Sequence, residues 1–377
     1  MVKRVVISVT SDLSTDQRVR RAASALKDDG FEVVLVGRLL SNSLDINNLN
    51  YTAKRFKLWF NKGPLFYANY NLRLFFFLMF IKADILLAND LDTLLPNYLV
   101  SVLRKKVLIY DNHEYFTGVP ELVNRPLVKG IWKKIERWIF PRLKSVYTVN
   151  ESIAGLYEEE YRVRVGVVRN VPEVLPISTQ PKNGCRKQLD LPTDKFIIIL
   201  QGNGINIQRG AEEAVEAMKN VNALLLIAGN GDVIEQLKSM VKEFGLTEKV
   251  IFKSRMPYHQ LVQYTQCADL GLTLDKNTNV NYRYSLPNKL FDYIQCRVPI
   301  LASDLVEVKK VIDGYVIGTC INKVTPEEIS TNINQIINNP NLLRQWHINL
   351  DKAASELNWE KEKHILLQIV RNAIARN

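Results

Sequence analysis

The sequence predicts an α/β protein of two doubly wound, Rossmann-like domains in tandem, and three observations lead to this prediction. The chain has 377 residues, which exceeds the roughly 250–300 residues at which one hydrophobic core usually stops growing. Short β-branched runs alternate with helical stretches, beginning with VVISV, a helix over residues 17–29 and EVVLV, as expected for βαβ units around a parallel sheet. The alternation breaks once and then restarts, which indicates a second domain of the same class.

Each half of the chain supplies its own series of predicted strands. In the first half, further strands are expected at residues 83–88, 106–111, 145–150 and 165–170. Residues 171–192 contain four prolines among polar residues, which predicts an interdomain linker and entry loop. In the second half, strands are expected at 196–202, 223–231, 250–252, 269–274 and 298–303, separated by helical segments.

The charge of the chain is basic and uneven. It carries 50 Lys+Arg against 39 Asp+Glu, a net charge of +11. Residues 1–175 hold 26 basic and 18 acidic side chains, a balance of +8, and residues 176–377 hold 24 and 21, a balance of +3. An anionic partner is therefore expected, chiefly for the first domain. Nucleic acid is not expected as that partner, because no recognition motif of that class is present and the basic residues do not alternate with aromatics.

The cysteines and the apolar segments indicate the cellular compartment of the protein. Four cysteines without a CxxC pair, and without histidines at ligand spacing, predict neither a disulfide framework nor a metal site. The N-terminal apolar run is too short for a signal peptide, and LRLFFFLMFI at residues 72–81 falls short of the roughly 20 residues of a membrane-spanning helix. A cytoplasmic protein is expected. Residues 54–80 mix cations with aromatics, which suits either a peripheral membrane surface or core aromatics with snorkelling lysines.

Two stretches of the second half are candidates for a phosphate site. In SLPNKLFDYIQCRVPILASD, a helix N-terminus offers free N–H groups, Lys289 adds a positive charge and Asp292 is suited to sugar hydroxyls. In QGNGINIQRG, Gly202 and Gly204 allow the backbone to approach a ligand, and the guanidinium of Arg209 suits diphosphate oxygens. The spacing is not GxGxxG, so no nicotinamide cofactor is expected. Solvated side chains on ordinary surface turns are the alternative interpretation.

Polar residues also follow predicted strands of the first half. His113 and Glu114 come just after one strand, at the edge where open α/β sheets bind ligands. Asp12, Asp16 and Arg18 follow the first strand and are candidates for the same cleft. A structural histidine and helix-capping aspartates would give the same pattern, so both alternatives remain open.

Taken together, these stretches resemble the GT-B fold glycosyltransferases of the large retaining family 4, which use nucleotide-diphospho-sugars. The resemblance covers nearly the whole chain, and the order and spacing of the motifs make it specific. The segments that carry it are DQRVRRAASALKDDGFEVVLVG, YDNHE, VYTVNES, VVRNVPE, the QRG loop, LLLIAGNGD, FKSRMPYHQLVQYTQCADLGL, PNKLFDYIQCRVPILASD and LNWEKEKHILLQIV.

The resemblance assigns roles to single positions, and in two places the chain departs from the family pattern. It implies that His113 lies near the C6 hydroxyl of the donor sugar. The family's Arg and Lys for the donor diphosphate fall on Asn203 and Arg209, so the first cation is missing. The Glu-x7-Glu motif falls on Tyr284 and Asp292, so the first carboxylate is missing as well. This departure resembles a subgroup whose motif reads Pro-Asn-Lys.

The resemblance also implies the domain roles and the full set of site residues. Residues 1–175, with a returning C-terminal helix at 357–377, would bind the acceptor, and residues 176–356 would bind the donor, the two domains facing a central cleft. Catalytic roles fall to His113, Arg209 and Lys289. Donor contacts fall to Gly202, Asn203, Gly204, Arg255, Met256, Pro287, Asn288, Leu290 and Asp292, and cleft positions to Asp12, Asp16, Arg18, Glu114, Asn150 and Asn170.

The expected activity is retaining, metal-independent transfer of a sugar from a nucleotide-diphospho-sugar to a glycan or lipid-linked acceptor. Such chemistry needs cationic and N–H stabilisation of the departing diphosphate more than a protein base. Two alternatives remain open: a UDP-sugar epimerase of the same fold, and a non-catalytic subunit that binds nucleotide sugars. The location expected from the resemblance is the cytoplasm, at the inner face of the cytoplasmic membrane.

Overall fold

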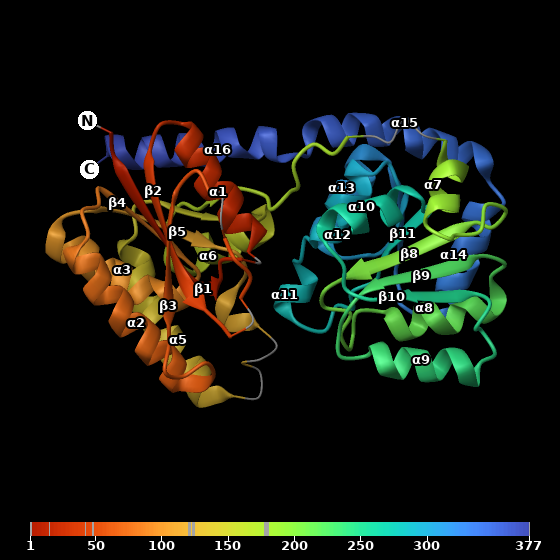
Figure 1. The fold of residues 1–377 in the computed structure, drawn as a ribbon, viewed down its shortest axis with the longest axis horizontal. Helices are drawn as coiled ribbons and strands as arrows, with labels where there is room; N and C mark the ends of the chain where they lie inside the picture. Colours follow the sequence, from red (N-terminus) through yellow and green to blue (C-terminus); the bar gives the residue numbers. More distant parts are fainter. Residues whose placement is uncertain are drawn as a thin grey trace. The chain divides into compact units, whose positions relative to one another are not determined.

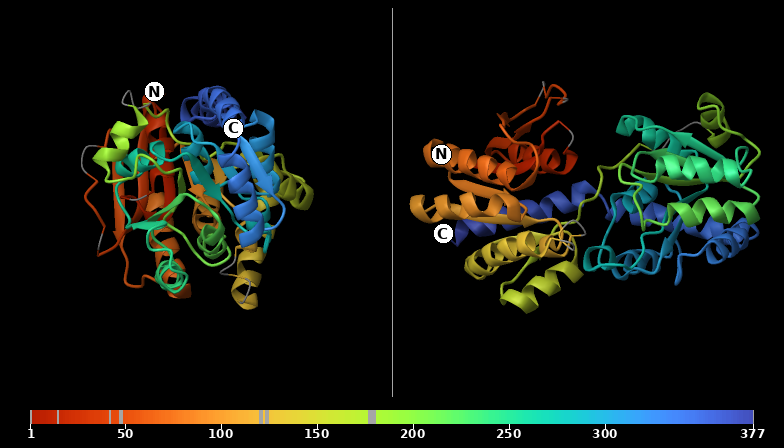
Figure 2. Two further views of the ribbon diagram at one scale, coloured as in Figure 1. Left: turned by 90° about the vertical axis from the view of Figure 1, so that its right-hand side faces the viewer. Right: turned by 90° about the horizontal axis from the view of Figure 1, so that it is seen from below.

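The chain forms two compact units. The computed structural model describes residues 2–14, 16–41, 43–46, 49–119, 122, 125–176 and 181–376. Unit 1 comprises Met1–Asn170 together with Glu362–Asn377, and unit 2 comprises Val171–Lys361 (Figure 1). Each unit contains one parallel sheet with helices packed on it, which confirms the predicted fold class (Figure 2).

Unit 1 is built on a seven-stranded sheet in the order β3-β2-β1-β4-β5-β6-β7, in which every pair is parallel. The strand order reverses between β1 and β4. In open α/β sheets, ligands bind at the carboxyl ends of the strands beside such a reversal. The strands are β1 (Arg4–Asp12), β2 (Glu32–Leu39), β3 (Thr52–Lys57), β4 (Ile85–Asn89), β5 (Val107–Asn112), β6 (Val146–Thr148) and β7 (Gly166–Val167).

The helices of unit 1 cover both faces of this sheet. Right-handed crossovers put the helix after β1 on one face and those after β3, β4 and β5 on the other. Helices α2, α3 and α5 pack against one another in that order. None of the described helices is long and apolar enough to cross a membrane. The helices are α1 (Gln17–Asp28), α2 (Gly63–Phe80), α3 (Leu91–Arg104), α5 (Pro126–Ile139), α6 (Glu151–Tyr161) and α16 (Trp359–Ala375).

Unit 2 is built on a six-stranded parallel sheet in the order β10-β9-β8-β11-β12-β13, with its own reversal between β8 and β11. The strands are β8 (Ile197–Gly202), β9 (Leu224–Gly229), β10 (Val250–Lys253), β11 (Leu270–Thr273), β12 (Ile300–Ser303) and β13 (Gly318–Ile321). The helices are α7 (Lys182–Gln188), α8 (Ala211–Ala217), α9 (Ile234–Glu243), α10 (Tyr258–Gln266), α11 (Val280–Arg283), α12 (Asn288–Gln295), α13 (Val306–Tyr315), α14 (Pro326–Ile337) and α15 (Pro340–Glu356).

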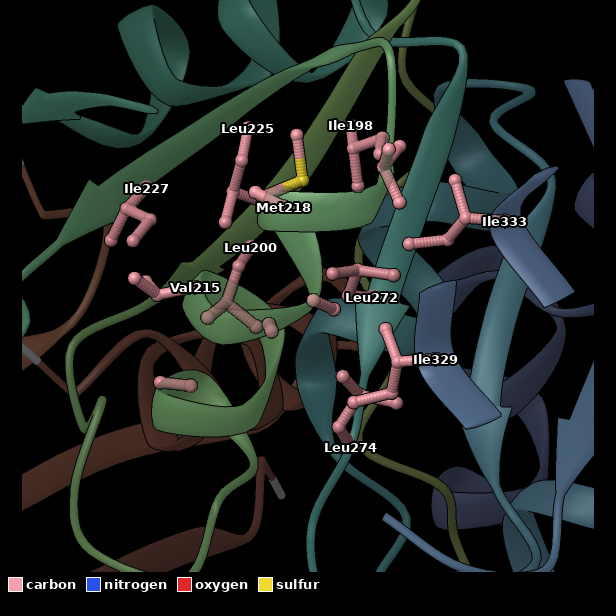
Figure 3. Close-up of a cluster of buried hydrophobic side chains, with 14 of the residues drawn as sticks. Ile198, Leu200, Val215, Met218, Leu225, Ile227, Leu272, Leu274, Ile329 and Ile333 are labelled. Atoms are coloured by element: carbon pink, nitrogen blue, oxygen red, sulfur yellow. The ribbon is translucent and has the colours of Figure 1, made fainter. Parts of the chain in front are cut away.

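The continuous apolar runs of unit 2 are explained by burial on both faces of its sheet. Along β8, Ile198 and Leu200 join one buried cluster, drawn in Figure 3, whereas Ile197 and Ile199 join a second cluster. Successive strand residues point to opposite faces, so a strand covered by helices on both sides is apolar at every position.

One prediction for the segment between the units was wrong. Residues 171–192 were expected to be a linker, yet they contain α7, which packs on unit 2. The guanidinium of Arg186 is buried and donates hydrogen bonds to the carbonyl of Cys267 and to a carboxylate oxygen of Asp269. These tertiary contacts stabilise a seven-residue helix that is too short to be stable alone. Residues 177–180 lie outside the described ranges.

Candidate functional site

Unit 2 brings Arg209 and Lys289 to the same buried carboxylate. Arg209 lies in the loop that precedes α8, and Lys289 lies in the first turn of α12. The Nη1 atom of Arg209 is 3.6 Å from Oδ1 of Asp275, and Nζ of Lys289 is 3.7 Å from the same oxygen. Two residues that are 80 positions apart in the sequence thus form one cationic cluster beyond the ends of β8 and β11.

Asp275 is the member of this cluster that the sequence did not single out. It follows β11, is 1% exposed, and borders a cavity of about 290 Å³ together with Thr278 and Ser303. The guanidinium carbon of Arg209 also lies 5.0 Å from the ring centroid of Tyr282, in a cation–π geometry. Burial lowers the pKa of Lys289, and so does the nearby charge of Arg209, whereas Asp275 raises it.

The glycine loop after β8 is fixed by backbone contacts with the loop after β9. The N–H of Asn230 donates to the carbonyl of Gly202, and the N–H of Ile205 donates to the carbonyl of Asn230. A Cβ atom on Gly229 would lie 1.8 Å from the Gly202 carbonyl oxygen, so glycine is needed there for the close approach. Gly210 has φ of +73°, and its Cβ would meet Leu274 at 2.5 Å. Both glycines therefore hold the loop that carries Arg209.

Asp292 faces a neighbouring polar network. Its Oδ2 accepts a hydrogen bond from Nε2 of Gln201 at 2.9 Å, and its Oδ1 accepts one from the hydroxyl of Tyr258 at 2.8 Å. The amide oxygen of Gln201 in turn accepts from the hydroxyl of Thr265 at 2.6 Å. Asp292 is half-buried on α12, so these contacts orient a carboxylate that still reaches the surface.

The remaining predicted donor residues of unit 2 differ in exposure. Asn203, Arg255 and Asn288 are exposed, and Gly202, Gly204, Met256 and Pro287 are half-buried. Pro287 is the N-cap residue of α12. Leu290 is fully buried within the hydrophobic core, so its side chain packs inside unit 2 and lines no surface.

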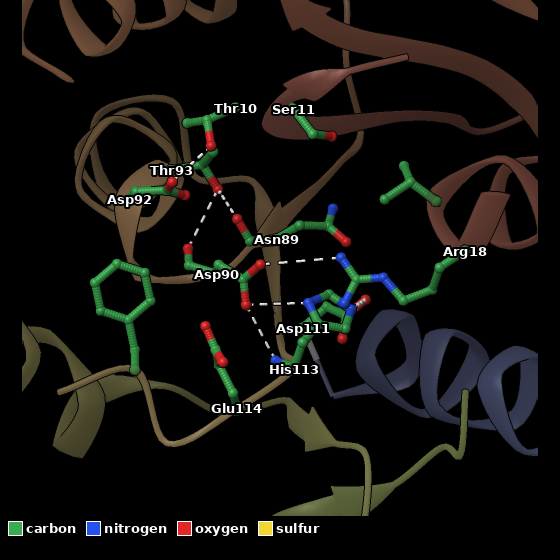
Figure 4. A network of polar contacts seen from close by, with 12 residues as sticks. Thr10, Ser11, Arg18, Asn89, Asp90, Asp92, Thr93, Asp111, His113 and Glu114 are labelled. Carbon is green, nitrogen blue, oxygen red and sulfur yellow. Dashed lines mark hydrogen bonds and ion pairs between the residues drawn. The ribbon is translucent and has the colours of Figure 1, made fainter. Parts of the chain in front are cut away.

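Unit 1 places His113 between two carboxylates, as Figure 4 shows. The Nδ1 atom of His113 is 3.0 Å from Oδ1 of Asp90, and Nε2 is 3.1 Å from Oδ2 of Asp111. Its backbone N–H also donates to Oδ1 of Asp90. Each ring nitrogen thus faces a carboxylate oxygen. A neutral imidazole carries one N–H proton, so a second proton, on the ring or on one of the two carboxyl groups, is needed for both contacts to be hydrogen bonds.

Three carboxyl groups at this edge have raised pKa values. Burial, as the largest cause, raises the pKa of Asp90 to about 6 and those of Asp92 and Asp111 to about 7. The charge of Arg18 opposes this effect at Asp90 and Asp111, and a hydrogen bond from Thr10 at 2.6 Å opposes it at Asp92. Groups that titrate near neutrality in this way are concentrated at functional sites.

Asp90 adopts a backbone conformation that is unusual for a residue with a side chain. Its φ and ψ are 59° and 165°, a region populated essentially by glycine and costing about 1–3 kcal/mol for other residues. The Nη2 atom of Arg18 lies 3.9 Å from its Oδ2, and the exposed Glu114 lies nearby (Figure 4). The surrounding contacts must hold Asp90 in this strained position. No sequence pattern had indicated it.

The other predicted cleft residues of unit 1 make structural hydrogen bonds. Asp16 caps α1 by accepting from the N–H of Val19, and Asn150 caps α6 by accepting from the N–H of Ile153. Asp12 accepts from Ser43 and Ser14; these bonds lower its pKa although partial burial acts in the opposite direction. Asn170 accepts from Nη2 of Arg21 at 2.5 Å. Arg18, in the first turn of α1, extends toward His113, and its Nη2 atom lies 3.9 Å from Oδ2 of Asp90.

In the part of the chain that the structure describes, no group of three or more His, Cys, Asp or Glu side chains is arranged to hold a metal ion. The four cysteines, all of them among the described residues, form no disulfide.

Comparisons with known proteins cover almost the whole chain. Residues 182–352 match the family model described as Glycosyl transferases group 1, and residues 16–172 match the model Glycosyltransferase Family 4. A curated relative is the chitobiosyldiphosphodolichol beta-mannosyltransferase of Candida albicans, 21% identical over 277 residues, or 66% of this chain. The aligned region spans 60% of the length of that relative.

Solved structures give the same picture of the fold. The sucrose-phosphate synthase of Thermosynechococcus elongatus superposes with a TM-score of 0.79 at 17% identity, over 100% of both chains. Anabaena Alr3699/HepE in complex with UDP-glucose superposes with a TM-score of 0.77 at 14% identity, over 98% of both chains.

Proposed function

Because the chain belongs to the GT-B glycosyltransferases that these two family models describe, we propose that it transfers a sugar from a nucleotide-diphospho-sugar to a glycan or lipid-linked acceptor, with retention and without a metal ion. One observation carries this proposal. Arg209 and Lys289 converge within 3.6 and 3.7 Å of one carboxylate oxygen, in the unit that matches the group 1 model.

The cationic cluster supplies what the departure of a nucleoside diphosphate requires. Negative charge develops on the diphosphate as the glycosidic bond breaks, and fixed cations and N–H groups stabilise it in a site shielded from water. Arg209, Lys289 and the N-terminus of α12 provide such groups, and two protein cations can take the place of a divalent metal. Asp292, oriented by Gln201 and Tyr258, is suited to accept hydrogen bonds from ribose hydroxyls.

The acceptor is assigned to unit 1. Asp90, Asp111 and Glu114, which lie around His113 in Figure 4, have carboxylate oxygens suited to accept hydrogen bonds from sugar hydroxyls. We assign His113 to the donor sugar. The Anabaena neighbour was solved with UDP-glucose, and the name of the Candida relative describes a lipid-linked, diphosphate-containing substrate. The first supports a nucleotide-sugar donor for this chain, and the second supports a lipid-linked acceptor.

A membrane contact accords with such an acceptor. One stripe of α2 exposes Leu65, Leu72, Phe76 and Phe80. The neighbouring α5 exposes Leu127, Ile131 and Trp138 beside the exposed cations Lys129, Lys134 and Arg137. Apolar side chains interspersed with cations suit the interface of an anionic lipid layer. We therefore assign unit 1 to the cytoplasmic face of a membrane, and extend the surface expected at residues 54–80 to α5.

The decisive experiment is a donor panel followed by product analysis. Binding of UDP-, GDP- and other nucleotide sugars is screened by a shift in melting temperature, since a ligand that binds only the folded state stabilises it. The donor found is incubated with lipid-linked and soluble glycans, and the anomeric configuration of the product is read by NMR. Transfer with retention in the presence of EDTA is expected, and inversion or an EDTA-sensitive rate contradicts the corresponding part of the proposal.

A non-catalytic nucleotide-sugar binding subunit is the second candidate. It is favoured by Asn203 and Tyr284, which stand where related enzymes carry a cation and a carboxylate. Donor binding without turnover across the acceptor panel would support it, and release of a new nucleotide sugar without any acceptor would indicate an epimerase instead.

A further inference from the structure

Asp275 carries a buried charge that is paired with two cations and, among the described residues, lacks hydrogen bonds. Its side chain is 1% exposed, and neither of its carboxylate oxygens has a hydrogen-bond partner within the described residues. The charged groups close to it are Arg209, in the loop before α8, and Lys289, at the start of α12. A buried carboxylate without hydrogen bonds is costly unless charges of opposite sign compensate it.

The two cations repel each other, so holding them together requires a compensating negative charge. Both lie within 4 Å of one oxygen atom, Oδ1 of Asp275, so they are near neighbours that repel each other. Their side chains come from segments on either side of β11, and the shared carboxylate is what favours keeping both charged groups at this place. Tyr282, stacked on Arg209, adds a further constraint on the guanidinium.

We propose that Asp275 is a positioning residue for donor binding, which holds Arg209 and Lys289 side by side before the diphosphate arrives. The inference rests on the proposed function, because it concerns the site at which a nucleoside diphosphate would bind. Asp275, which is 1% exposed, acts in this proposal through the two cations and not by binding the donor itself.

The electrostatics of Lys289 support this role and give its sign. Burial and the charge of Arg209 lower the pKa of Lys289, and Asp275 raises it. Neutralising Asp275 therefore leaves only influences that lower this pKa. In Asp275→Asn, Lys289 loses its proton at a lower pH than in the wild type, and affinity for a diphosphate falls as the pH rises through that range.

The experiment compares binding of UDP, GDP and inorganic pyrophosphate by calorimetry between pH 7.5 and 9.5. We expect the affinity of Asp275→Asn to fall about tenfold or more across this range, because binding that needs a protonated amine weakens about tenfold for each pH unit above the pKa of that amine, while the wild type changes far less. The double variant Asp275→Asn, Lys289→Arg should regain a flat profile, because arginine stays protonated throughout. Asp313→Asn, at an exposed position on α13, removes the same charge elsewhere in unit 2 and should match the wild type.

A second measurement separates this inference from the proposed function. The pKa of Lys289 is read directly from NMR titration of protein carrying ¹³C-labelled lysine, with Lys289→Arg identifying its signal, and no ligand is needed. If the wild type binds none of the three diphosphates, the proposed donor site fails, and the titration still tests Asp275. An unchanged pKa of Lys289 in Asp275→Asn, or an unchanged pH profile of binding, overturns the positioning role.

Discussion

The two sheets end in polar clusters of opposite character. In unit 1, the carboxyl ends of β4 and β5 place Asp90 and Asp111 around His113, with Arg18 close to Asp90. A third carboxyl group, that of the buried Asp92, lies at the start of α3. In unit 2, the ends of β8 and β11 gather two cations around one carboxylate. The same topological position therefore carries an excess of hydrogen-bond acceptors in one unit and of positive charge in the other. Fold alone does not decide the ligand; the side chains placed at the strand ends do.

The overall charge runs opposite to these clusters. The first 175 residues have a balance of +8, yet the cluster of unit 1 is acidic, so the excess of cations lies elsewhere on its surface. Part of it is the exposed face of α5, next to the apolar stripe of α2. The net charge of unit 1 thus indicates an anionic partner for its exposed surface. It gives no information about the acidic cluster around His113.

Removal of either cation of unit 2 should have the largest effect. We expect Lys289→Ala and Arg209→Ala each to lower the rate of transfer about 100-fold or more, the usual scale for loss of one contact to a transition state. The rate is measured at saturating donor by product formation. Lys238→Ala, on the outer surface of α9, removes a comparable cation outside the cluster and should leave the rate unchanged. Near-normal turnover in either cluster variant would mean that the cations do not serve the diphosphate.

The second largest effect concerns a buried carboxyl group of unit 1. Burial raises the pKa of Asp92 to about 7, from 3.8 in the unfolded chain. The folded state therefore binds this proton more tightly, and stability is lost as the pH rises from about 4 to about 7. Asparagine stands in for the protonated form, can still accept from Thr10, and places an amide where Oδ1 of Asp92 now has no hydrogen-bond partner.

We expect Asp92→Asn to be about 4 kcal/mol more stable than the wild type at pH 8, since each unit by which the pKa is raised, from 3.8 to about 7, is worth about 1.4 kcal/mol, and nearly equal to it near pH 4. Urea unfolding at several pH values measures the difference. Asp45→Asn, at an exposed position in the same unit, should show no such dependence. A constant difference at all pH values would contradict the raised pKa and weaken the contrast between the two clusters.

Much of the fold could be predicted from the sequence, because its signals are local. Runs such as residues 197–200 are apolar at every position since both faces of the sheet are covered. The short helix α7 was missed because its stability comes from contacts of the buried Arg186 with Cys267 and Asp269, which are distant in sequence. The confirmed fold class thus rests on periodicity, and the exception rests on tertiary contacts.

The candidate sites could be predicted only in part. Glycines and a Pro-Asn-Lys motif drew attention to the segments that contain Arg209 and Lys289. Asp275 and Asp90 had no such signal, because a single aspartate after a strand is common at helix caps and turns. Their significance comes from burial, from shared partners and, for Asp90, from a left-handed φ, and none of these can be read from residue order.

Asp90 allows a test confined to the acidic cluster. Asp90→Asn should lower transfer about tenfold through loosened positioning of His113, and leave the affinity for UDP or GDP unchanged, because those probes lack the sugar. Asp90→Gly removes the same carboxylate but suits the φ of 59°, so it should lose transfer while melting at least as high as Asp90→Asn. Rates and calorimetric affinities are compared for both variants. Normal transfer by a folded Asp90→Gly protein would mean that the carboxylate of Asp90 has no role in sugar transfer.

The smallest effect is expected at the outer surface of unit 1. The two units differ in how their exposed apolar side chains are distributed. Phe76 and Phe80, 52% and 83% exposed, lie on one stripe of α2. Among the described residues of unit 2, the exposed large apolar side chains, such as Ile348 at 61%, lie on different segments. Substituting both phenylalanines by serine should reduce flotation with anionic liposomes several-fold, by removing apolar area that would enter the lipid interface.

The same double variant should transfer sugar to a soluble acceptor at the wild-type rate, because exposed substitutions change stability by only about 0.5 kcal/mol. Ile348→Ser is the matched control in unit 2 and should float like the wild type. Added salt should weaken the flotation of all three proteins, since the cations of α5 act through a screened attraction. Flotation that is indifferent to both the serines and the salt would mean that the apolar stripe of α2 serves another partner, and that the excess charge of unit 1 is not directed to lipid.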